Sequence, residues 1–162
     1  YQTALSFTSQ NVGGERQDRI PKIVFQCLAI VTVVGAVLGN LAYQCGPFLL
    51  NIYSSDPEVI QYGMSRMQII CQWYFLCGIM DVAVGILRGM GYSVMPMLVS
   101  LAGACGLRVL WIFTVFVWKH SLFVLYLSYP ITWTITLAVH FICFFVIWKR
   151  KKGAGAMVKV AE

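Results

Sequence analysis

The chain has 162 residues, of which 59% are hydrophobic and only 11% are charged, and its mean hydropathy is +0.76. A soluble domain has about 45–50% apolar and about 25% charged residues, so this chain has too little polar surface to cover an ordinary core. Because the apolar residues form long blocks, the composition excludes a soluble domain and predicts an integral membrane protein. The net charge of +6 does not indicate nucleic-acid binding, because the basic residues stand at the ends of the apolar blocks and form no face.

The first segment is a half-apolar run, YQTALSFTSQ, that is too short to cross a bilayer. We expect it to be the end of a helix whose beginning is missing, and the sequence to be a fragment. The stretch that follows, GGERQDRIPK, combines glycines, mixed charges and Pro21, which are typical of a water-exposed turn. Pro21 suits the first turn of the next helix, because its missing N–H is not needed there.

Four apolar blocks are long enough to cross the membrane as helices. We expect these spans at about 24–50, 67–87, 94–118 and 122–148. The first contains Gly35-x-x-x-Gly39, which allows a neighbouring helix to approach closely. A polar connection, 51–64, follows it, and the basic residues 149–162 form a tail that we expect to be disordered and exposed. The predicted fold class is all-α, a polytopic transmembrane helix bundle of residues 1–148 with a basic tail.

The positions of Lys and Arg predict how the spans are oriented. Four spans place both chain ends and the loop at Arg88 on one side of the membrane. That side has nine basic residues: Arg16, Arg19, Lys22, Arg88, Lys149, Arg150, Lys151, Lys152 and Lys159. The other side has Arg66 and Lys119, together with Asp56 and Glu58. By the positive-inside rule we expect a multi-pass protein of the cell (plasma or inner) membrane with a cytoplasmic C-terminus.

Asp81, at the start of the stretch DVAVGILRGMGYSVMP, is the most costly group in the predicted membrane region. A carboxylate among apolar neighbours inside a span normally faces a bundle interior or a wet cavity. Residues three, four and seven positions away share its helical face. They are small or polar at almost every step: Tyr74, Cys77, Gly78, Val84, Gly85 and Arg88. This stripe predicts an interior face that either packs closely against a helix or lines a cavity.

Arg108, near the middle of the third span, is the second costly group. The two charges differ in depth by roughly 8 Å, much of which an Arg side chain can cover. One hypothesis is a structural ion pair between Asp81 and Arg108, in which each charge makes the other tolerable. The other is that Asp81 takes a proton, a cation or a cationic substrate during a transport cycle. The two are compatible if the pair breaks as the protein changes state.

The remaining polar, aromatic and sulfur-containing residues have simpler explanations. Aromatic residues near the span ends favour interfacial belts, although Tyr74 shares the face of Asp81 and remains a candidate. His140, with apolar neighbours, favours a satisfied buried histidine over a proton relay. The six cysteines form no C-x-x-C pair and favour reduced packing residues over a metal site or a disulfide framework. No spacing typical of a catalytic site occurs, so we do not expect an enzyme.

Five motifs in this order resemble the C-terminal part of a MATE (multidrug and toxic compound extrusion) transporter. They are SFTSQNVGGERQDRIPK, SSDPEVIQYG, LRGMGYSVMPM, CGLRVLWIFTVF and SYPITWTIT. The third resembles the L-R-G-x-G segment between the fourth and fifth helices of a MATE lobe. It singles out a hinge or loop motif of Arg88, Gly89, Gly91 and Pro96.

The resemblance implies a transporter of two six-helix lobes, in which this chain holds the end of helix 8 and helices 9 to 12. Such proteins expel organic, often cationic, compounds in exchange for Na⁺ or H⁺ by alternating access. In the NorM-like branch an acidic residue of helix 10 takes part in cation coupling. Here the matching helix carries Asp81 about one turn nearer the L-R-G segment, and Cys77 stands in the place of that acid.

Asp81, Arg108 and Tyr74 are therefore the candidates for substrate binding or ion coupling. No cofactor is expected apart from the coupling ion, and no metal site. The expected partners are a small organic substrate, the lipid bilayer and the missing N-terminal lobe, without nucleic acid. Two other classes stay open: a lipid-linked oligosaccharide flippase built from similar lobes, and a non-transporting four-helix membrane subunit. A flippase would favour a more basic cavity than Asp81 alone suggests.

Overall fold

The structure is a computed structural model that describes the backbone of residues 1–161 and the side chains of residues 1–151. In this part of the chain every regular element is a helix, which confirms the predicted all-α class. The elements in chain order are α1 (Gln2–Gly13), η1 (Gln17–Arg19), α2 (Ile20–Gln44), α3 (Gly46–Tyr53), α4 (Pro57–Gln72), α5 (Tyr74–Gly89), α6 (Val94–Ser100), η2 (Leu101–Gly106), α7 (Leu107–Trp111), η3 (Ile112–Phe116) and α8 (Leu122–Ala161). Of the three η segments, η1 is a 3₁₀-helix and η2 and η3 are π-helices.

Three stretches within the described residues are long and apolar enough to cross a membrane: Gln17–Gln44, Val94–Phe116 and Leu122–Lys151. The pair α4 and α5 passes the same test together, but its two helices are bent by 44° where they join. By length and composition the described residues therefore contain three candidate spans, or four if this bent pair crosses as one broken span. Its side chains agree with a lipid environment, because large apolar residues of α2 such as Phe25, Val33 and Val37 are exposed.

The structure corrects the predicted bounds of the first span and of the connection after it. The expected span at 24–50 ends early, because α2 stops at Gln44 and a new helix, α3, begins with Pro47 in its first turn. The expected polar connection at 51–64 is mostly helical. Its acidic residues start α4, where the Asp56 carboxylate caps the helix by accepting a hydrogen bond from the Glu58 N–H at 2.9 Å.

The second span and the tail also differ from the prediction. The expected span at 67–87 contains a break at Trp73, where α4 ends and α5 begins. No glycine or proline marks this position in the sequence, so the break carries no local signal. The tail expected to be disordered at 149–162 continues α8 as a helix to Ala161, and Glu162 lies outside the described residues. The expected span at 94–118 is helical from Val94 to Phe116, with two π-helical segments inside it.

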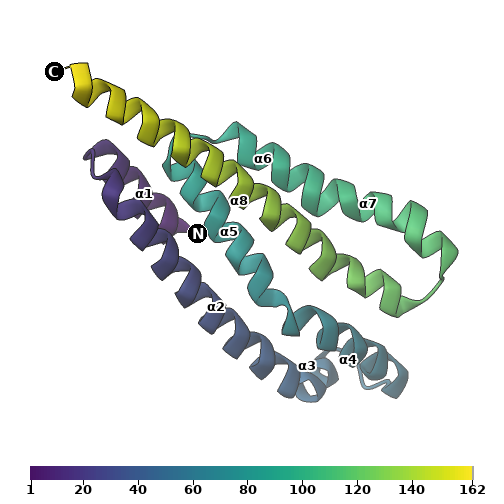
Figure 1. Ribbon diagram of the computed structural model, residues 1–162. Coiled ribbons are helices and arrows are strands. Elements are labelled where there is room, and N and C mark those ends of the chain that lie inside the picture. The colour runs from purple at the N-terminus through teal and green to yellow at the C-terminus, as the bar shows by residue number, and fades with distance from the viewer. Residues whose placement is uncertain (162) are drawn as a thin grey trace.

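Helix α5 is the centre of the bundle, as Figure 1 shows. It contacts α1 and α2 along one side and α8 along another. The third span, which runs from α6 to η3, packs mainly on α8, and neither α7 nor η3 contacts α5. The apolar core joins α1, α2 and α5 to α8. It consists of Ala4, Ile20, Val82, Ile86, Leu87, Met90, Phe144 and Ile147.

Glycines allow the closest of these helix contacts. On α2, Gly35 lies against the backbone of Phe75 and Gly39 against that of Cys71. On α5, Gly85 lies against Tyr1 and Ala4, and Gly89 against Leu5 and Thr8 of α1. A side chain at any of these glycines would meet backbone atoms of the neighbouring helix. The helices can therefore approach this closely only because these positions are glycines. This confirms the expectation of a close neighbour at Gly35-x-x-x-Gly39.

The contact of α8 with the third span uses polar side chains instead. Four buried polar residues lie one turn apart on α8: Ser128, Thr132, Thr136 and His140. The three hydroxyls donate hydrogen bonds of 2.6–2.7 Å to carbonyl oxygens of their own helix. These bonds satisfy the groups without water, which makes them tolerable in a membrane interior.

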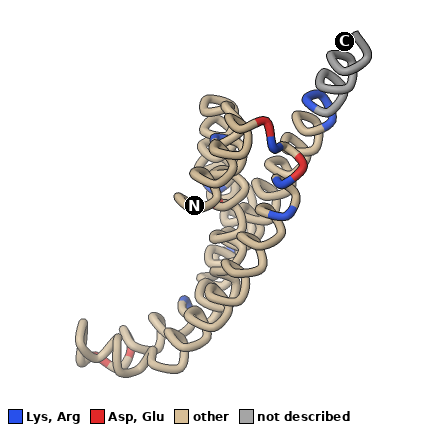
Figure 2. Tube along the Cα trace, turned by 90° about the vertical axis from the view of Figure 1, so that its left-hand side faces the viewer, with Lys and Arg blue, Asp and Glu red and all other residues tan. Residues whose placement is uncertain are grey.

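Most of the Lys and Arg residues lie toward the end of the bundle where α8 leaves it, as Figure 2 shows. The α1–α2 junction, the loop after α5 and the last turns of α8 all reach this end (Figure 1). The opposite end holds α3 and the start of α4, with Asp56 and Glu58. The helix directions therefore agree with those that the predicted spans require.

Candidate functional site

Asp81 lies on the part of α5 that neither neighbouring helix covers. Gly85 on its face contacts the Tyr1 end of α1, and Gly78 contacts Val31 of α2. Tyr74, two turns earlier, reaches toward α8. The Asp81 side chain is exposed between these contacts, and it makes no hydrogen bond or ion pair with the described residues. The predicted interior face is thus partly packed, by its glycines, and open at the acid itself.

Arg108 lies between two π-helical segments of the third span, η2 and η3. Its guanidinium carbon is 3.9 Å from the centre of the Tyr129 ring, so the cation stacks on the face of an aromatic side chain of α8. The Nε–H of Arg108 is buried and has no hydrogen-bond partner among the described side chains. Such π-helical turns are rare in proteins, and those that occur are frequently found at functional sites. This feature distinguishes the third span from the other spans.

The predicted Asp81–Arg108 ion pair is not formed. The single ion pair among the described side chains joins Arg16 and Asp18 at 3.7 Å, in the exposed α1–α2 junction. The reason is the arrangement of the helices, because α8 lies between α5 and α7 and offers Tyr129 to the guanidinium.

An aromatic series connects Arg108 to Tyr74. The Tyr129 ring meets the Trp133 ring edge-on at 5.9 Å between centroids, and Trp133 meets Tyr74 edge-on at 6.2 Å. Edge-to-face contacts at these distances are the favoured geometry for aromatic pairs. Trp133 is 7% exposed, whereas Tyr74, the last ring of this aromatic series, is 54% exposed. The structure therefore brings together two of the three candidates, through residues of α8 that sequence reasoning missed.

A signal for these missed residues was present in the sequence. Tyr129 and Trp133 are four residues apart in SYPITWTIT, so they share one face of α8. Their nearness to the predicted span end favoured an interfacial belt for Tyr129. Its position beneath Arg108 shows instead an inward role, which depends on the register between α7 and α8.

The L-R-G segment is fixed on both sides by contacts to distant parts of the chain. Arg88 donates a hydrogen bond to the Tyr1 hydroxyl at 2.7 Å, and Gly89 is buried against α1. Gly91 has φ +95°, a left-handed conformation that favours glycine and turns the chain into α6. From α8, the Lys151 ammonium donates to the Met90 carbonyl at 3.0 Å.

Pro96, the last member of this motif, is buried beside His140. The Nε2 atom of His140 lies 3.3 Å from the Pro96 carbonyl oxygen and 3.4 Å from the Ser100 hydroxyl, and Nδ1 lies 2.8 Å from the Thr136 carbonyl oxygen. His140 is fully buried with partners at both ring nitrogens, which confirms the prediction of a satisfied buried histidine. His140 joins α8 to the beginning of the third span.

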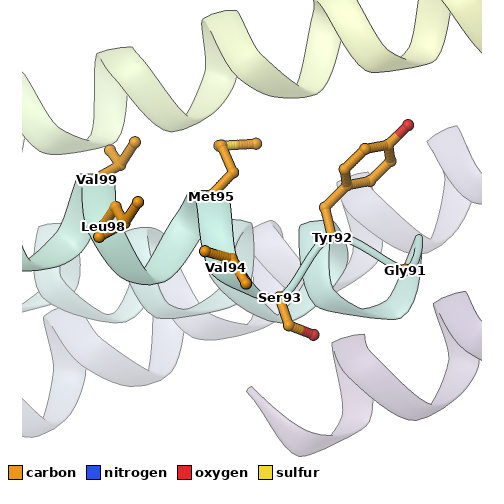
Figure 3. Close-up of a pocket in the computed structure, with 7 residues that line it drawn as sticks. All are labelled: Gly91, Tyr92, Ser93, Val94, Met95, Leu98 and Val99. Carbon is orange, nitrogen blue, oxygen red and sulfur yellow. The ribbon is translucent and has the colours of Figure 1, made fainter.

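A shallow cavity of about 470 Å³ lies beside the L-R-G segment. Figure 3 shows Tyr92, Met95 and Val99 pointing toward α8, while Ser93 and Val94 point away from it. Its lining is largely apolar and offers two hydroxyl groups but no charged side chain. The cavity therefore offers no charged group with which to bind an ion.

Metal ligation finds no support in the part of the chain that the structure describes. No group of three His, Cys, Asp or Glu side chains lies close enough together to hold an ion. All six cysteines are free, and four of them are half-buried among apolar neighbours. Asp81, Arg108 and the aromatic series are thus the groups in the membrane region that have chemistry to offer a ligand.

Comparison with known proteins places these residues in a family. Residues 3–114, well over half of the chain, match the family model described as MatE, and this range contains Asp81, the L-R-G segment and Arg108. The chain is also similar to the probable multidrug resistance protein YoeA of Bacillus subtilis (strain 168), with 22% identity over 151 residues. The alignment covers 90% of this chain and 32% of that relative, so the chain spans about a third of its length. The chain belongs to the MatE family of membrane transporters.

Proposed function

We propose that this chain is part of a secondary active multidrug efflux transporter. It would export organic, often cationic, compounds in exchange for Na⁺ or H⁺ by alternating access. The observation that carries the proposal is the family match over the helices that hold Asp81 and Arg108. The printed name of the relative, a probable multidrug resistance protein, supports the same class of substrate.

The geometry around Asp81 supports a role in coupling. A carboxylate in a span is costly unless it serves a ligand or a partner, and Asp81 has no ion-pair partner among the described side chains. A group in this state is free to take a proton, a cation or a cationic substrate. Two turns along the same face, the exposed ring of Tyr74 offers an aromatic surface, which attracts organic cations.

Arg108 gives this site a second state. Its guanidinium now stacks on Tyr129, and its Nε–H lacks an acceptor among the described residues. A rearrangement of α7 and α8 that brought the guanidinium to Asp81 would neutralise the acid and discourage cation binding. In this proposal the two hypotheses drawn from the sequence are the two states of one cycle.

The remaining parts of the proposal concern the surroundings of the chain. Because the chain spans about a third of its relative, a further lobe would supply the other wall of the cavity that Asp81 faces. The concentration of Lys and Arg at the end where α8 leaves the bundle favours a cytoplasmic C-terminus in the cell membrane. Nothing in the proposal requires a cofactor other than the coupling ion.

The test uses the complete natural protein that contains this chain, carrying Asp81→Asn. Cells that express it should lose ion-driven export of an organic cation such as ethidium, while membrane insertion is unchanged. Asp56→Asn is the matched control, since it makes the same change at an exposed helix cap that Asn can also form. Export by Asp81→Asn that responds to Na⁺ and H⁺ gradients like the wild type would leave Asp81 as a structural residue.

One observation favours a flippase for lipid-linked oligosaccharides as a second candidate. The unpartnered Nε–H of Arg108 would suit an anionic diphosphate group better than an organic cation. Deletion of the gene distinguishes the two functions, because a flippase mutant has cell-envelope defects and an efflux mutant has raised drug sensitivity. A deletion without either effect, in a protein with no further spans, would favour a non-transporting subunit.

A further inference from the structure

The junction of α1 and α2 carries a polar cavity that the proposed transport cycle does not use. It has a volume of about 570 Å³ and lies at the end of the bundle where basic residues gather (Figure 2). Two cations, Arg19 and Lys22, line it together with three carboxamides, Gln10, Asn11 and Gln26. The described residues of its wall include no Asp or Glu, so the cavity has a positive charge and many hydrogen-bond donors.

The two cations are not used by the protein itself. Neither Arg19 nor Lys22 forms an ion pair or a side-chain hydrogen bond with the described residues. Asp18, the acid next to Arg19, is paired with Arg16 at 3.7 Å. Both cations therefore keep their donors free, and a phosphate is the anion that such a mixture of ammonium, guanidinium and amide groups binds well.

The cavity continues into an apolar groove. A second hollow of about 480 Å³ shares Phe7, Ile23 and Gln26 with the first and runs toward Ala29 and Ile30. Its lining is mainly apolar, and α2 at this point belongs to a stretch apolar enough to cross the membrane. A polar, basic pocket at the membrane boundary thus continues into an apolar groove along α2.

We propose that this composite groove binds one anionic phospholipid of the bilayer. The phosphate lies on Arg19 and Lys22, the carboxamides hydrogen-bond the headgroup, and one acyl chain follows Phe7, Ile23 and Ile30. Basic pockets between helices at the membrane surface recognise anionic headgroups in this way. The apolar half of the groove separates this ligand from a free phosphate ion, which would occupy the basic half alone.

The bound lipid connects α1 to α2, because both helices contribute residues to each half of the groove. The other side of α1 packs against Gly85 and Gly89 of α5. Lipid binding should therefore stabilise the position of α1 beside the L-R-G segment. This inference depends on the placement of the chain in a membrane and not on the transported substrate, so it stands or falls separately from the efflux proposal.

The experiment measures lipid retention by native mass spectrometry on the purified complete protein in detergent. Phosphatidylglycerol and phosphatidylcholine with identical acyl chains are the probes, and thermal unfolding is followed in parallel. Phosphatidylglycerol should be retained as one molecule and raise the unfolding midpoint, and phosphatidylcholine should do neither. The double variant Arg19→Gln, Lys22→Gln should weaken phosphatidylglycerol binding about tenfold or more. The control pair Arg66→Gln, Lys119→Gln, at the opposite end, should not.

A second variant tests the apolar half without changing any charge. Ala29→Trp fills the groove and should also displace phosphatidylglycerol, whereas Val33→Trp, one turn further along α2 and outside the groove, should not. Equal retention of the two lipids, or normal binding in both groove variants, would overturn the proposal. So would full displacement of the lipid by millimolar inorganic phosphate, which would show a site for a free anion.

Discussion

The two sides of α5 are built on different principles. Toward α1 and α2 it meets its neighbours at glycines, with backbone against backbone, as at Gly35 and Phe75, and α2 meets α4 in the same way at Gly39 and Cys71. Toward α8 and the third span the contacts are made by side chains: hydroxyls, His140, and the aromatic series from Tyr129 to Tyr74. Backbone contacts leave no room for adjustment, whereas side chains can change rotamer and partner. The comparison indicates a fixed half and an adaptable half, with Asp81 at the boundary.

The adaptable half also contains the π-helical backbone. Both π-helical segments lie in the third span, on either side of Arg108. This span reaches the rest of the bundle mainly through α8. A displacement of α7 against α8 would therefore leave the glycine contacts of α1, α2 and α5 intact. The geometry agrees with a lobe in which the third span moves while the group of α1, α2 and α5 keeps its shape.

The largest effect should come from adding one methyl group to the fixed half. Gly39→Ala places a Cβ against the Cys71 carbonyl, and backbone atoms on both sides cannot move cheaply. We expect the free energy of unfolding in detergent to fall by about 2–3 kcal/mol. Gly13→Ala is the control, because a Cβ there meets nothing within 4 Å. Equal unfolding midpoints for the two variants would show that the close contact is not present.

The same substitution in the adaptable half should cost less stability, and a second substitution should recover most of the loss. Gly103→Ala brings a Cβ against the side chain of Thr136, with an expected cost of about 1–2 kcal/mol. Trimming the neighbour with Thr136→Ala should recover most of this loss, since the contact is with a side chain. The measurement is a double-mutant cycle on thermal unfolding. Additive costs would mean that Gly103 and Thr136 do not touch.

The stacking of Arg108 should contribute less again. Tyr129→Leu removes the aromatic face beneath the guanidinium and should cost about 1 kcal/mol, while Tyr129→Phe keeps the face and should cost little. Unfolding of the two variants in detergent checks this difference. A loss with Phe as large as that with Leu would assign the effect to the hydroxyl group.

The smallest effect is expected at the L-R-G segment. Tyr1→Phe removes the hydroxyl that accepts the hydrogen bond from Arg88, in an exposed position, and should cost about 0.5 kcal/mol. Tyr92→Phe is the control on the same loop. If Tyr1→Phe were as harmless as that control, the Arg88–Tyr1 contact would have no role in holding α1 to the segment.

The sequence predicted what depends on local patterns. Block lengths predicted the long apolar helices and the glycine spacing predicted the close contact of α2, whereas the role of Asp81 stays a prediction. It did not predict the break at Trp73, because no glycine or proline marks it. It also did not predict the partner of Arg108, since the choice of Tyr129 over Asp81 depends on α8 lying between α5 and α7. Such choices are set by helix order in space, which a single sequence does not encode locally.

The most direct test concerns the surroundings of Asp81. A spin label at Asp81→Cys, in the complete protein with its native cysteines replaced and in a lipid bilayer, reports collision with oxygen, which concentrates in lipid, and with a water-soluble nickel chelate. A label at Val37→Cys, on the exposed apolar face of α2, is the lipid-facing reference. The account predicts low oxygen collision at position 81, with either nickel access from a wet cavity or exclusion of both reagents by protein. Oxygen collision as frequent as at position 37, without nickel access, would contradict it, because the carboxylate would then face lipid.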